Sequence, residues 1–356
     1  MKKIDDIKLL ENLLKIPSPS GFERKIAEYI ADEARKYTSA KNVSIDQYNT
    51  VTAVIKGTGK KTVMIDAHLD EIGFIVTNIS KHGIISLQYI GGGCNHILSA
   101  RELVILTEKG PINAVVDRTH AHLVGSENDE AIDNIYQAQV DIGVRKRSYT
   151  AKYIKIGDPV VYKANFQKLV GPYYSGYGFD DKAGCYMLLE TMREISKSKT
   201  KPVPTLVFTF SSQEEIGGKK IRIPIAKYNP DLFVELDVTF ATDYGSGMEE
   251  EVGKCDLGEG VVTYRGVGID RKTLKLLETT ANTNKIKTQV QAASGRDGYT
   301  TSYATPYGAK ALVIGIPLRN MHTPVEIINI NDLKNGYHLL KNFLLNQRLE
   351  ARLEDR

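Results

Sequence analysis

The pattern of apolar residues changes twice along the 356-residue chain, and these changes constrain the fold more than any other feature. Residues 1–70 and 166–356 alternate helical and strand patterns, which is typical of a sheet covered by helices. Residues 71–165 carry short alternating segments separated by turn residues, which predict a small barrel or sandwich. The sequence therefore predicts a discontinuous α/β domain, 1–70 plus 166–356, interrupted by an inserted all-β domain, 71–165.

Local patterns within these regions predict individual helices and strands. Ser20 and Glu23 form a capping-box pattern, which predicts the start of a second helix. The run 62–67 is largely apolar, as expected for a strand buried on both faces. The other predicted helices cover 5–16, 181–195, 272–283 and 331–345, and the other strands 50–55, 205–210, 232–236 and 311–316. The strands expected in the insertion cover 73–79, 84–90, 102–107, 114–116, 138–144 and 159–163.

The composition is that of an ordinary globular protein, with 42% apolar and 25% charged residues. The net charge of +4 is small and distributed, which argues against nucleic-acid binding. No apolar run approaches the roughly 20 residues of a membrane span, and acidic residues interrupt the N-terminus before any signal-like segment. Three widely spaced cysteines without a CxxC pair indicate reduced thiols in a cytoplasmic protein.

Five short stretches carry the residue types that a two-metal hydrolase needs. Hard divalent metals bind carboxylate oxygens, and zinc also binds imidazole nitrogen. Two ions about 3.5–4 Å apart together activate water and stabilise an anionic intermediate. The stretches are 66–71, 179–182, 213–218, 235–237 and 321–324. Because each lies beside a predicted strand end or turn, they are expected to meet at the carboxyl edge of the sheet.

Two of these stretches pair a candidate ligand with a neighbouring acid. His68 and Asp70 form an H-x-D pair, in which Asp70 could orient a metal-binding histidine. The alternative is a surface His-Asp pair at a strand end. Asp181 fits a simple N-cap of the following helix, whereas Asp180, one residue earlier, is free to bridge two ions.

The remaining candidates also have structural alternatives. Glu214 and Glu215 repel one another unless a cation or a proton separates their roles, and the alternative is a solvated acidic loop. Asp237 ends a strand, with Glu235 as the alternative candidate. His322, taken alone, indicates an ordinary loop histidine.

In this order the five stretches resemble the cytosolic metallo-aminopeptidases that assemble as large tetrahedral particles. This TET family includes glutamyl and deblocking aminopeptidases, and some members carry an endoglucanase label. The resemblance covers nearly the whole chain, including the β insertion. It implies a mixed-sheet α/β/α metallopeptidase domain with an inserted barrel-like or PDZ-like domain, in a cytoplasmic homo-oligomer built from dimers into a dodecamer. It also implies hydrolysis of N-terminal residues from peptides.

The resemblance implies two divalent metal ions per subunit, with zinc or cobalt fitting the nitrogen and oxygen ligands. Asp180 would bridge both ions. His68 and Asp237 would complete one site, and Glu215 and His322 the other.

The resemblance also implies roles beside the metals. Glu214 would be the general acid and base, and Asp70 the partner that orients His68. The peptide bond between Asp180 and Asp181 would be cis. Arg296 is a candidate that the resemblance does not imply, since many relatives have a small or polar residue there; it could supply the cation that binds an acidic N-terminal residue of the substrate.

Spacing alone does not separate an aminopeptidase from related activities. A metal-dependent acyl-amino-acid deacylase or a carboxypeptidase would need the same ligand types. A non-catalytic scaffold that keeps the fold is an alternative of a different class, and bound metal would distinguish it from an enzyme.

Overall fold

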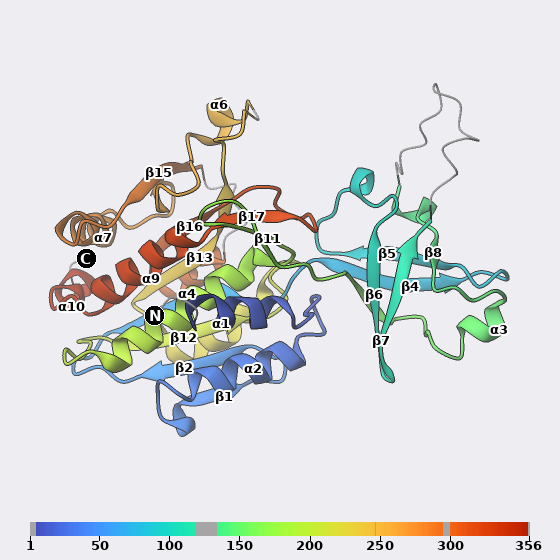
Figure 1. Cartoon of the computed structure of the whole chain (residues 1–356). Coiled ribbons are helices and arrows are strands. Elements are labelled where there is room, and N and C mark those ends of the chain that lie inside the picture. Colours follow the sequence, from blue (N-terminus) through green and yellow to red (C-terminus); the bar gives the residue numbers. More distant parts are fainter. Residues whose placement is uncertain (1–4, 118–133, 246, 295–299, 355–356) are drawn as a thin grey trace.

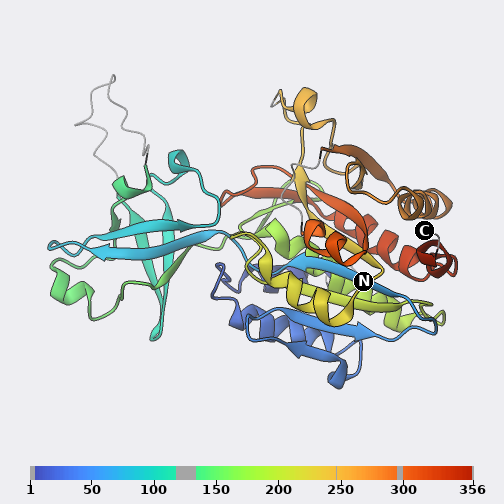
Figure 2. The same cartoon turned by 180° about the vertical axis from the view of Figure 1, so that it is seen from behind.

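The computed structural model describes residues 5–117, 134–245, 247–294 and 300–354. Its larger part is an eight-stranded mixed sheet, which lies between helices on both faces (Figures 1 and 2). In spatial order its strands are β1 (Val43–Ile45), β2 (Val51–Ile55), β12 (Thr205–Ser211), β3 (Thr62–His68), β13 (Leu232–Phe240), β16 (Lys310–Leu318), β14 (Val261–Gly266) and β15 (Thr288–Ala293). The four central strands β12, β3, β13 and β16 are parallel, so their carboxyl ends share one edge.

Helices cover both faces of the sheet, and β3 alternates its side chains between them. Val63 and Ile65 lie in the hydrophobic cluster under α4, whereas Met64 lies in the opposite cluster with Ile225 of α5. The prediction of a strand buried on both faces is therefore confirmed. The helices are α1 (Asp5–Leu14), α2 (Arg24–Ala34), α4 (Phe179–Lys197), α5 (Arg222–Tyr228), α6 (Glu249–Val252), α7 (Arg271–Thr283), α8 (Thr301–Ala304), α9 (Ile330–Leu344) and α10 (Leu349–Glu354), with α3 (Arg147–Thr150) beside the barrel.

The smaller part is a closed antiparallel barrel with a hydrophobic core of its own, and it projects from one end of the larger part (Figure 1). Its strands, in order around the barrel, are β4 (Gly73–Ile79), β5 (Ile85–Ile90), β8 (Val140–Asp141), β7 (Gly110–Val116), β6 (Glu102–Thr107) and β9 (Pro159–Tyr162). A third sheet of three short strands contains β10 (Gln167–Lys168), β11 (Tyr173–Gly176) and β17 (Glu326–Asn329). The predicted fold class, a mixed α/β sheet with a small all-β unit, is confirmed.

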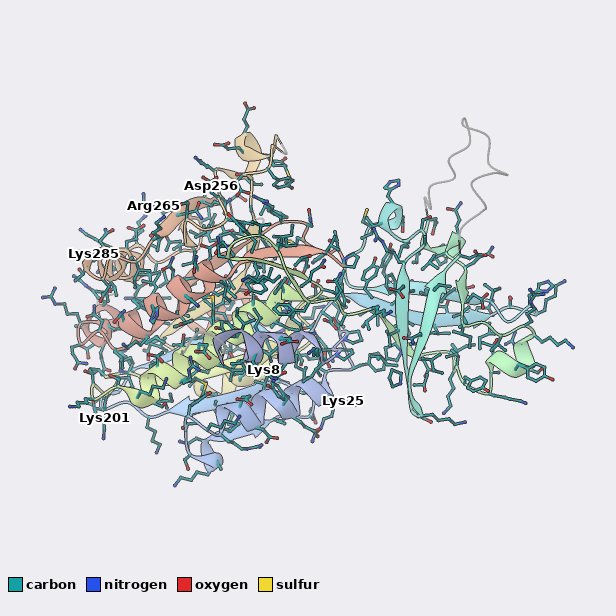
Figure 3. The ribbon with its side chains drawn as sticks, in the orientation of Figure 1. Lys8, Lys25, Lys201, Asp256, Arg265 and Lys285 are labelled. Atoms are coloured by element: carbon teal, nitrogen blue, oxygen red, sulfur yellow. The ribbon has the colours of Figure 1, made fainter. Side chains whose placement is uncertain are left out.

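Charged side chains surround the larger part on many elements. Figure 3 labels the exposed Lys8, Lys25, Lys201 and Lys285, which lie on α1, on α2, before β12 and after α7. Positive charge is therefore spread over the surface. Among the described residues, no helix is both long and apolar enough to cross a membrane.

The structure corrects the predicted start of the second helix. α2 begins at Arg24, and its preceding residue Glu23 makes no side-chain capping bond. Ser20 instead donates its hydroxyl to Asp70 Oδ2 over 2.6 Å, and Glu23 accepts from the N–H of Gly21 over 2.6 Å. The capping box is wrong because both side chains are engaged elsewhere, and the serine contributes to the site described below.

Replacing Glu23 by glutamine is expected to remove part of the pH dependence of stability. Burial raises the pKa of Glu23 from 4.5 to about 7. Between pH 4.5 and about pH 7, the folded protein thus binds one proton more than the unfolded chain at this residue. The free energy of unfolding should therefore fall as the pH rises through this range. At pH 8 we expect the Glu23→Gln protein to be more stable than wild type by roughly 1–3 kcal/mol, with little difference near pH 4.5.

Thermal unfolding at both pH values, with a chelator present to keep metal binding constant, checks this prediction. An equal pH dependence in both proteins would contradict it.

Candidate active site

The carboxyl edge of the central sheet opens into a cavity of about 1260 Å³, and the predicted residues come to it from separate elements. β3 ends at His68, α4 begins beside Asp180, and the loop after β12 carries Glu214. Six of the residues singled out in the sequence line this cavity: His68, Asp180, Glu214, Glu215, Asp237 and His322. The strand ends thus bring together side chains that are far apart in the sequence.

Asp180 lies between the two histidines, and each of its carboxylate oxygens faces one of them. The Oδ1 atom lies 3.0 Å from Nε2 of His68, and Oδ2 lies 3.3 Å from Nε2 of His322. The peptide bond between Asp180 and Asp181 is cis, as the resemblance implied. This arrangement gives one carboxylate two separate contacts.

A second carboxylate accompanies each histidine. Asp237 Oδ1 lies 3.8 Å from Nε2 of His68, and Glu215 Oε1 lies 3.3 Å from Nε2 of His322. The cavity therefore contains two groups of side chains that share Asp180. Each group offers one imidazole nitrogen and carboxylate oxygens.

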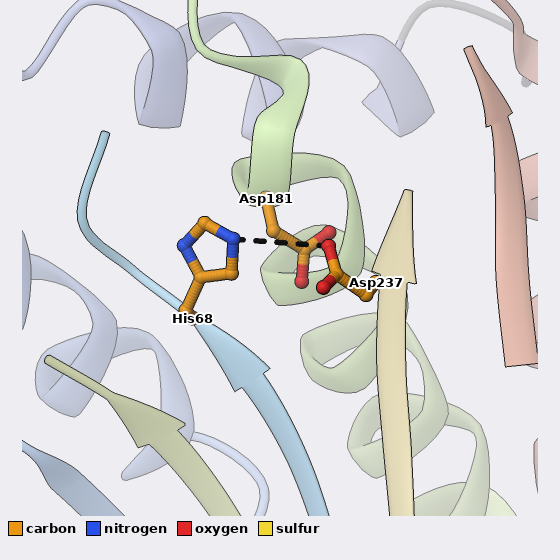
Figure 4. A group of neighbouring side chains, drawn as sticks. All are labelled: His68, Asp181 and Asp237. Carbon is orange, nitrogen blue, oxygen red and sulfur yellow. Dashed lines mark ion pairs between the residues drawn. The ribbon is translucent and has the colours of Figure 1, made fainter. Parts of the chain in front are cut away.

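Asp181 has a structural contact and also faces this site. Its Oδ1 accepts from the N–H of Gly184 over 3.0 Å, which confirms that it caps the regular part of α4. Its Oδ2 is buried without a hydrogen-bond partner. Figure 4 shows Asp181 pointing toward His68 and Asp237, and donor atoms of these three residues lie within 4.8 Å of one another. Asp181 is thus close enough to contact an ion, which its sequence position did not indicate.

The charges of the cavity change the pKa values of both histidines. Burial by itself lowers the pKa of His68, but the hydrogen bond to Asp180 and the charges of Glu214 and Asp237 outweigh it. The pKa of His68 therefore lies well above its ordinary value. The same balance, with Asp180 and Glu215 as partners, raises the pKa of His322 to about 11.

The carboxylates respond mainly to burial. Burial raises the pKa of Glu214 to about 8 and, with the charge of Asp180, raises that of Asp237 well above its usual range. Asp180 is the exception, because hydrogen bonds from both histidines outweigh burial and lower its pKa. Buried carboxylates in such excess are neutralised either by protonation or by a bound cation.

The donor set fits divalent metal ions. Imidazole nitrogen and carboxylate oxygen are the ligands that zinc and related ions bind. Asp181 Oδ2 is buried without a hydrogen-bond partner, and the buried Glu215 Oε1 has only its 3.3 Å ion-pair contact with His322. A bound cation would satisfy such atoms.

Asp70 lies beneath the site and joins two of its loops. His68 Nδ1 lies 3.0 Å from the main-chain oxygen of Asp70, whereas the nearer carboxylate oxygen is 3.7 Å away. The carboxylate accepts from the N–H groups of Glu214 and Glu215 over 2.9 and 3.2 Å, and from Ser20. Asp70 therefore contacts His68 through its backbone and the glutamate loop through its side chain.

Glu235, the alternative to Asp237, has a different environment. Its carboxylate accepts from the N–H and hydroxyl of Thr300, each over 2.7 Å, and from the N–H of Thr301 over 3.0 Å. These bonds occupy both oxygens. Asp237, rather than Glu235, therefore faces the cavity.

Sequence patterns did not indicate the ion pair that joins two ligand loops. Lys182 Nζ lies 2.5 Å from Glu71 Oε2, and both side chains are almost fully buried. Glu71 also accepts from the N–H of Ser18 over 2.8 Å, and Lys182 donates to the oxygen of Ile16 over 2.9 Å. The only sequence signal was that Glu71 and Lys182 flank the ligand motifs.

The barrel contributes a glycine loop beside the site. A Cβ atom on Gly92 would lie 2.8 Å from His322 Nδ1, and one on Gly91 would lie 3.2 Å from the Cβ of Glu215. Glycines therefore allow this loop to approach the ligands closely. Arg296, the predicted substrate-binding residue, lies outside the described residues.

Comparisons with known proteins find aminopeptidases among the proteins to which this chain is similar. A lysyl aminopeptidase of Pyrococcus furiosus is 28% identical over 349 residues, 95% of this chain and 96% of that protein. A glutamyl aminopeptidase of Lactococcus lactis is also 28% identical, over 96% of this chain and 95% of that one. The solved TET1 peptidase of Pyrococcus horikoshii has a TM-score of 0.85 at 26% identity, covering 96% of this chain and all of that one.

The family model for M42 glutamyl aminopeptidases matches residues 49–339, which include every candidate ligand and the whole barrel. The residues singled out by their metal chemistry therefore lie in the segment that matches a family of metal-dependent peptidases. The chain belongs to the M42 glutamyl aminopeptidase family and is a peptide-bond hydrolase.

Proposed function

We propose that the protein is a dinuclear metal-dependent aminopeptidase that removes N-terminal residues from peptides. The observation that carries this proposal is the position of Asp180, whose two oxygens face His68 and His322 separately. Asp180 would bridge the ions, with His68 and Asp237 on one side and Glu215 and His322 on the other. Zinc or cobalt fits this set of nitrogen and oxygen ligands best.

Two ions in this position would supply Lewis-acid activation of water and of the substrate carbonyl. The chain's own residues would handle the protons. Glu214 lines the cavity, and its backbone is held by Asp70. We propose that the Glu214 carboxylate accepts a proton from the attacking water and then donates it to the leaving amine. The roles of Asp70 and His68, an orienting group and the ligand that it orients, fit their contact through Nδ1.

The charges around the cavity favour a cationic N-terminal residue. Glu249, Glu250 and Glu251 line the cavity. Among the described residues that line the cavity, Arg265 is the one arginine. Arg265 forms an ion pair of 2.8 Å with Glu278 outside that lining, so its charge is already compensated. Opposite charges attract the substrate and like charges repel it.

Hydrolysis of aminoacyl p-nitroanilides tests this function. We expect chelation to abolish hydrolysis and zinc or cobalt to restore it, with lysyl substrates hydrolysed faster than glutamyl ones by roughly tenfold. Arg296 is the competing candidate, since it would favour acidic residues. A preference for glutamyl substrates that Arg296→Ala removes would support Arg296 and contradict the preference proposed from the three glutamates.

Peptides with blocked N-termini distinguish the related activities. An acyl-amino-acid deacylase would hydrolyse N-acetylated substrates, and a carboxypeptidase would release the C-terminal residue. A non-catalytic scaffold would bind less than one metal ion per subunit after reconstitution. Preferential hydrolysis of N-acetylated peptides would contradict the aminopeptidase proposal.

We further propose that residues 71–165 form a separate domain inserted into a catalytic domain of residues 1–70 and 166–356. Separate hydrophobic cores and the closure of the barrel support this division. The Pyrococcus horikoshii TET1 peptidase assembles into a tetrahedron or an octahedral shell, which supports a homo-oligomer here. Three free cysteines are consistent with a cytoplasmic enzyme. Light scattering of the purified chain would measure the assembly.

A further inference from the structure

We propose that Glu326 is a positioning residue that holds Asp180 and His322 in register for metal binding. This inference rests on the proposed dinuclear function and deepens it. Glu326 was not singled out in the sequence, and it does not line the cavity. It lies at the start of β17, opposite Gly176 of β11, beside the beginning of α4.

The hydrogen bonds of Glu326 join two ligand loops. Its Oε2 accepts from the N–H groups of Phe179 and Asp180 over 2.8 and 3.4 Å. Its Oε1 accepts from the N–H of His322 over 3.1 Å. The side chain is 2% exposed, so water does not compete for these bonds. One carboxylate therefore fixes the backbone of the proposed bridging ligand relative to that of a terminal ligand.

The backbone at His322 requires such support. Its φ angle is +60°, in the left-handed region that residues other than glycine rarely adopt. Such conformations persist where surrounding contacts hold them, and Glu326 supplies one to the N–H of this residue.

Asp70 forms the same kind of connection on the opposite side of the site. Its carboxylate accepts from the N–H groups of Glu214 and Glu215, while its main-chain oxygen contacts His68. Glu326 and Asp70 together contact the backbone or ring of every candidate ligand except Asp237. The two carboxylates hold different ligands: Glu326 holds the loops of Asp180 and His322, whereas Asp70 contacts His68, Glu214 and Glu215. Loss of Glu326 should therefore affect the ion beside His322 more than the ion beside His68.

The substitution Glu326→Gln retains one acceptor oxygen and replaces the other by an NH₂ group. An NH₂ group cannot accept from an N–H, so one of the two loops must lose its hydrogen bond. Loss of a group that orients a metal ligand typically weakens metal affinity by about 10–100-fold. We expect this loss for one of the two ions, with a smaller loss for the other.

Calorimetric titration of Co²⁺ into the metal-free full-length protein tests the proposal, together with the visible spectrum of bound Co²⁺. Wild type should bind two ions, and Glu326→Gln should bind one of them about 10–100-fold more weakly, with an altered spectrum. Glu326→Asp has a shorter side chain but keeps both carboxylate oxygens, so its Co²⁺ affinities should fall less. It also provides a second variant if the glutamine variant does not fold.

Asp332→Asn is the matched control. Asp332 is 1% exposed and accepts from the N–H groups of Gly258 and Gly260 over 2.7 and 2.8 Å, outside the lining of the cavity. Its variant should lose stability but keep both Co²⁺ affinities and the spectrum. Unchanged binding in both Glu326 variants, or an equal loss in Asp332→Asn, would overturn the proposal. Wild type that bound fewer than two ions would instead contradict the proposed dinuclear function.

Discussion

Replacing Glu214 by glutamine is expected to lower kcat by about 10²–10⁴-fold while both metal ions remain bound. Glutamine has nearly the same shape as glutamate but cannot take up and return a proton. The N–H of residue 214 would still donate to Asp70, because that bond belongs to the backbone. The variant thus removes the proton transfer and keeps the loop in place.

Steady-state kinetics with aminoacyl p-nitroanilides and metal analysis on the same preparations check this expectation. Glu108→Gln provides a control, since Glu108 is an exposed residue of the barrel that pairs with Lys155. We expect this control to retain wild-type kcat and metal content. Near-normal turnover in Glu214→Gln would show that another group transfers the proton.

Removing the carboxylate of Asp180 should have a still larger effect, because both proposed ions depend on it. We expect Asp180→Ala to bind both divalent ions more weakly and to lose at least about 10⁴-fold in kcat/KM. The reason is geometric, since the two oxygens of Asp180 face different histidines. Metal titration followed by kinetics at saturating metal would measure both effects.

Single-site variants make this test selective. Asp237 accompanies His68, and Glu215 accompanies His322. Asp237→Ala and Glu215→Ala should therefore each weaken one ion, and Asp180→Ala should weaken both. If Asp180→Ala reproduced either single-site variant, Asp180 would belong to one ion only, and the bridging role would be wrong.

The central part of the fold could be predicted because its strands are largely apolar runs. Residues 62–67 and 205–210 were predicted as strands, and β3 and β12 extend them by one residue each. Their ends then indicated where polar side chains would gather. The strands β14 and β15, at one end of the sheet, were not predicted, since Arg265 and Gly266 end β14 and polar residues such as Gln289 and Gln291 interrupt the apolar pattern of β15. Of the predicted strand 138–144, the structure pairs only Val140–Asp141.

The support around the site was harder to predict than the candidate ligands. Histidine and carboxylate motifs were visible as local patterns, and their residues line one cavity. Glu326 contacts backbone N–H groups that are 147 and 4 residues away along the chain. Ser20 contacts Asp70, 50 residues away. A side-chain hydrogen bond to a distant part of the chain leaves no periodicity or spacing in the sequence, so only coordinates reveal it.

Anomalous diffraction from crystals of the protein loaded with Co²⁺ or Zn²⁺ would test the central claim most directly. Two peaks are expected in the cavity, one touching His68 and Asp237 and the other touching Glu215 and His322. The carboxylate of Asp180 should contact both peaks. A single peak, or two peaks that do not share Asp180, would contradict the account.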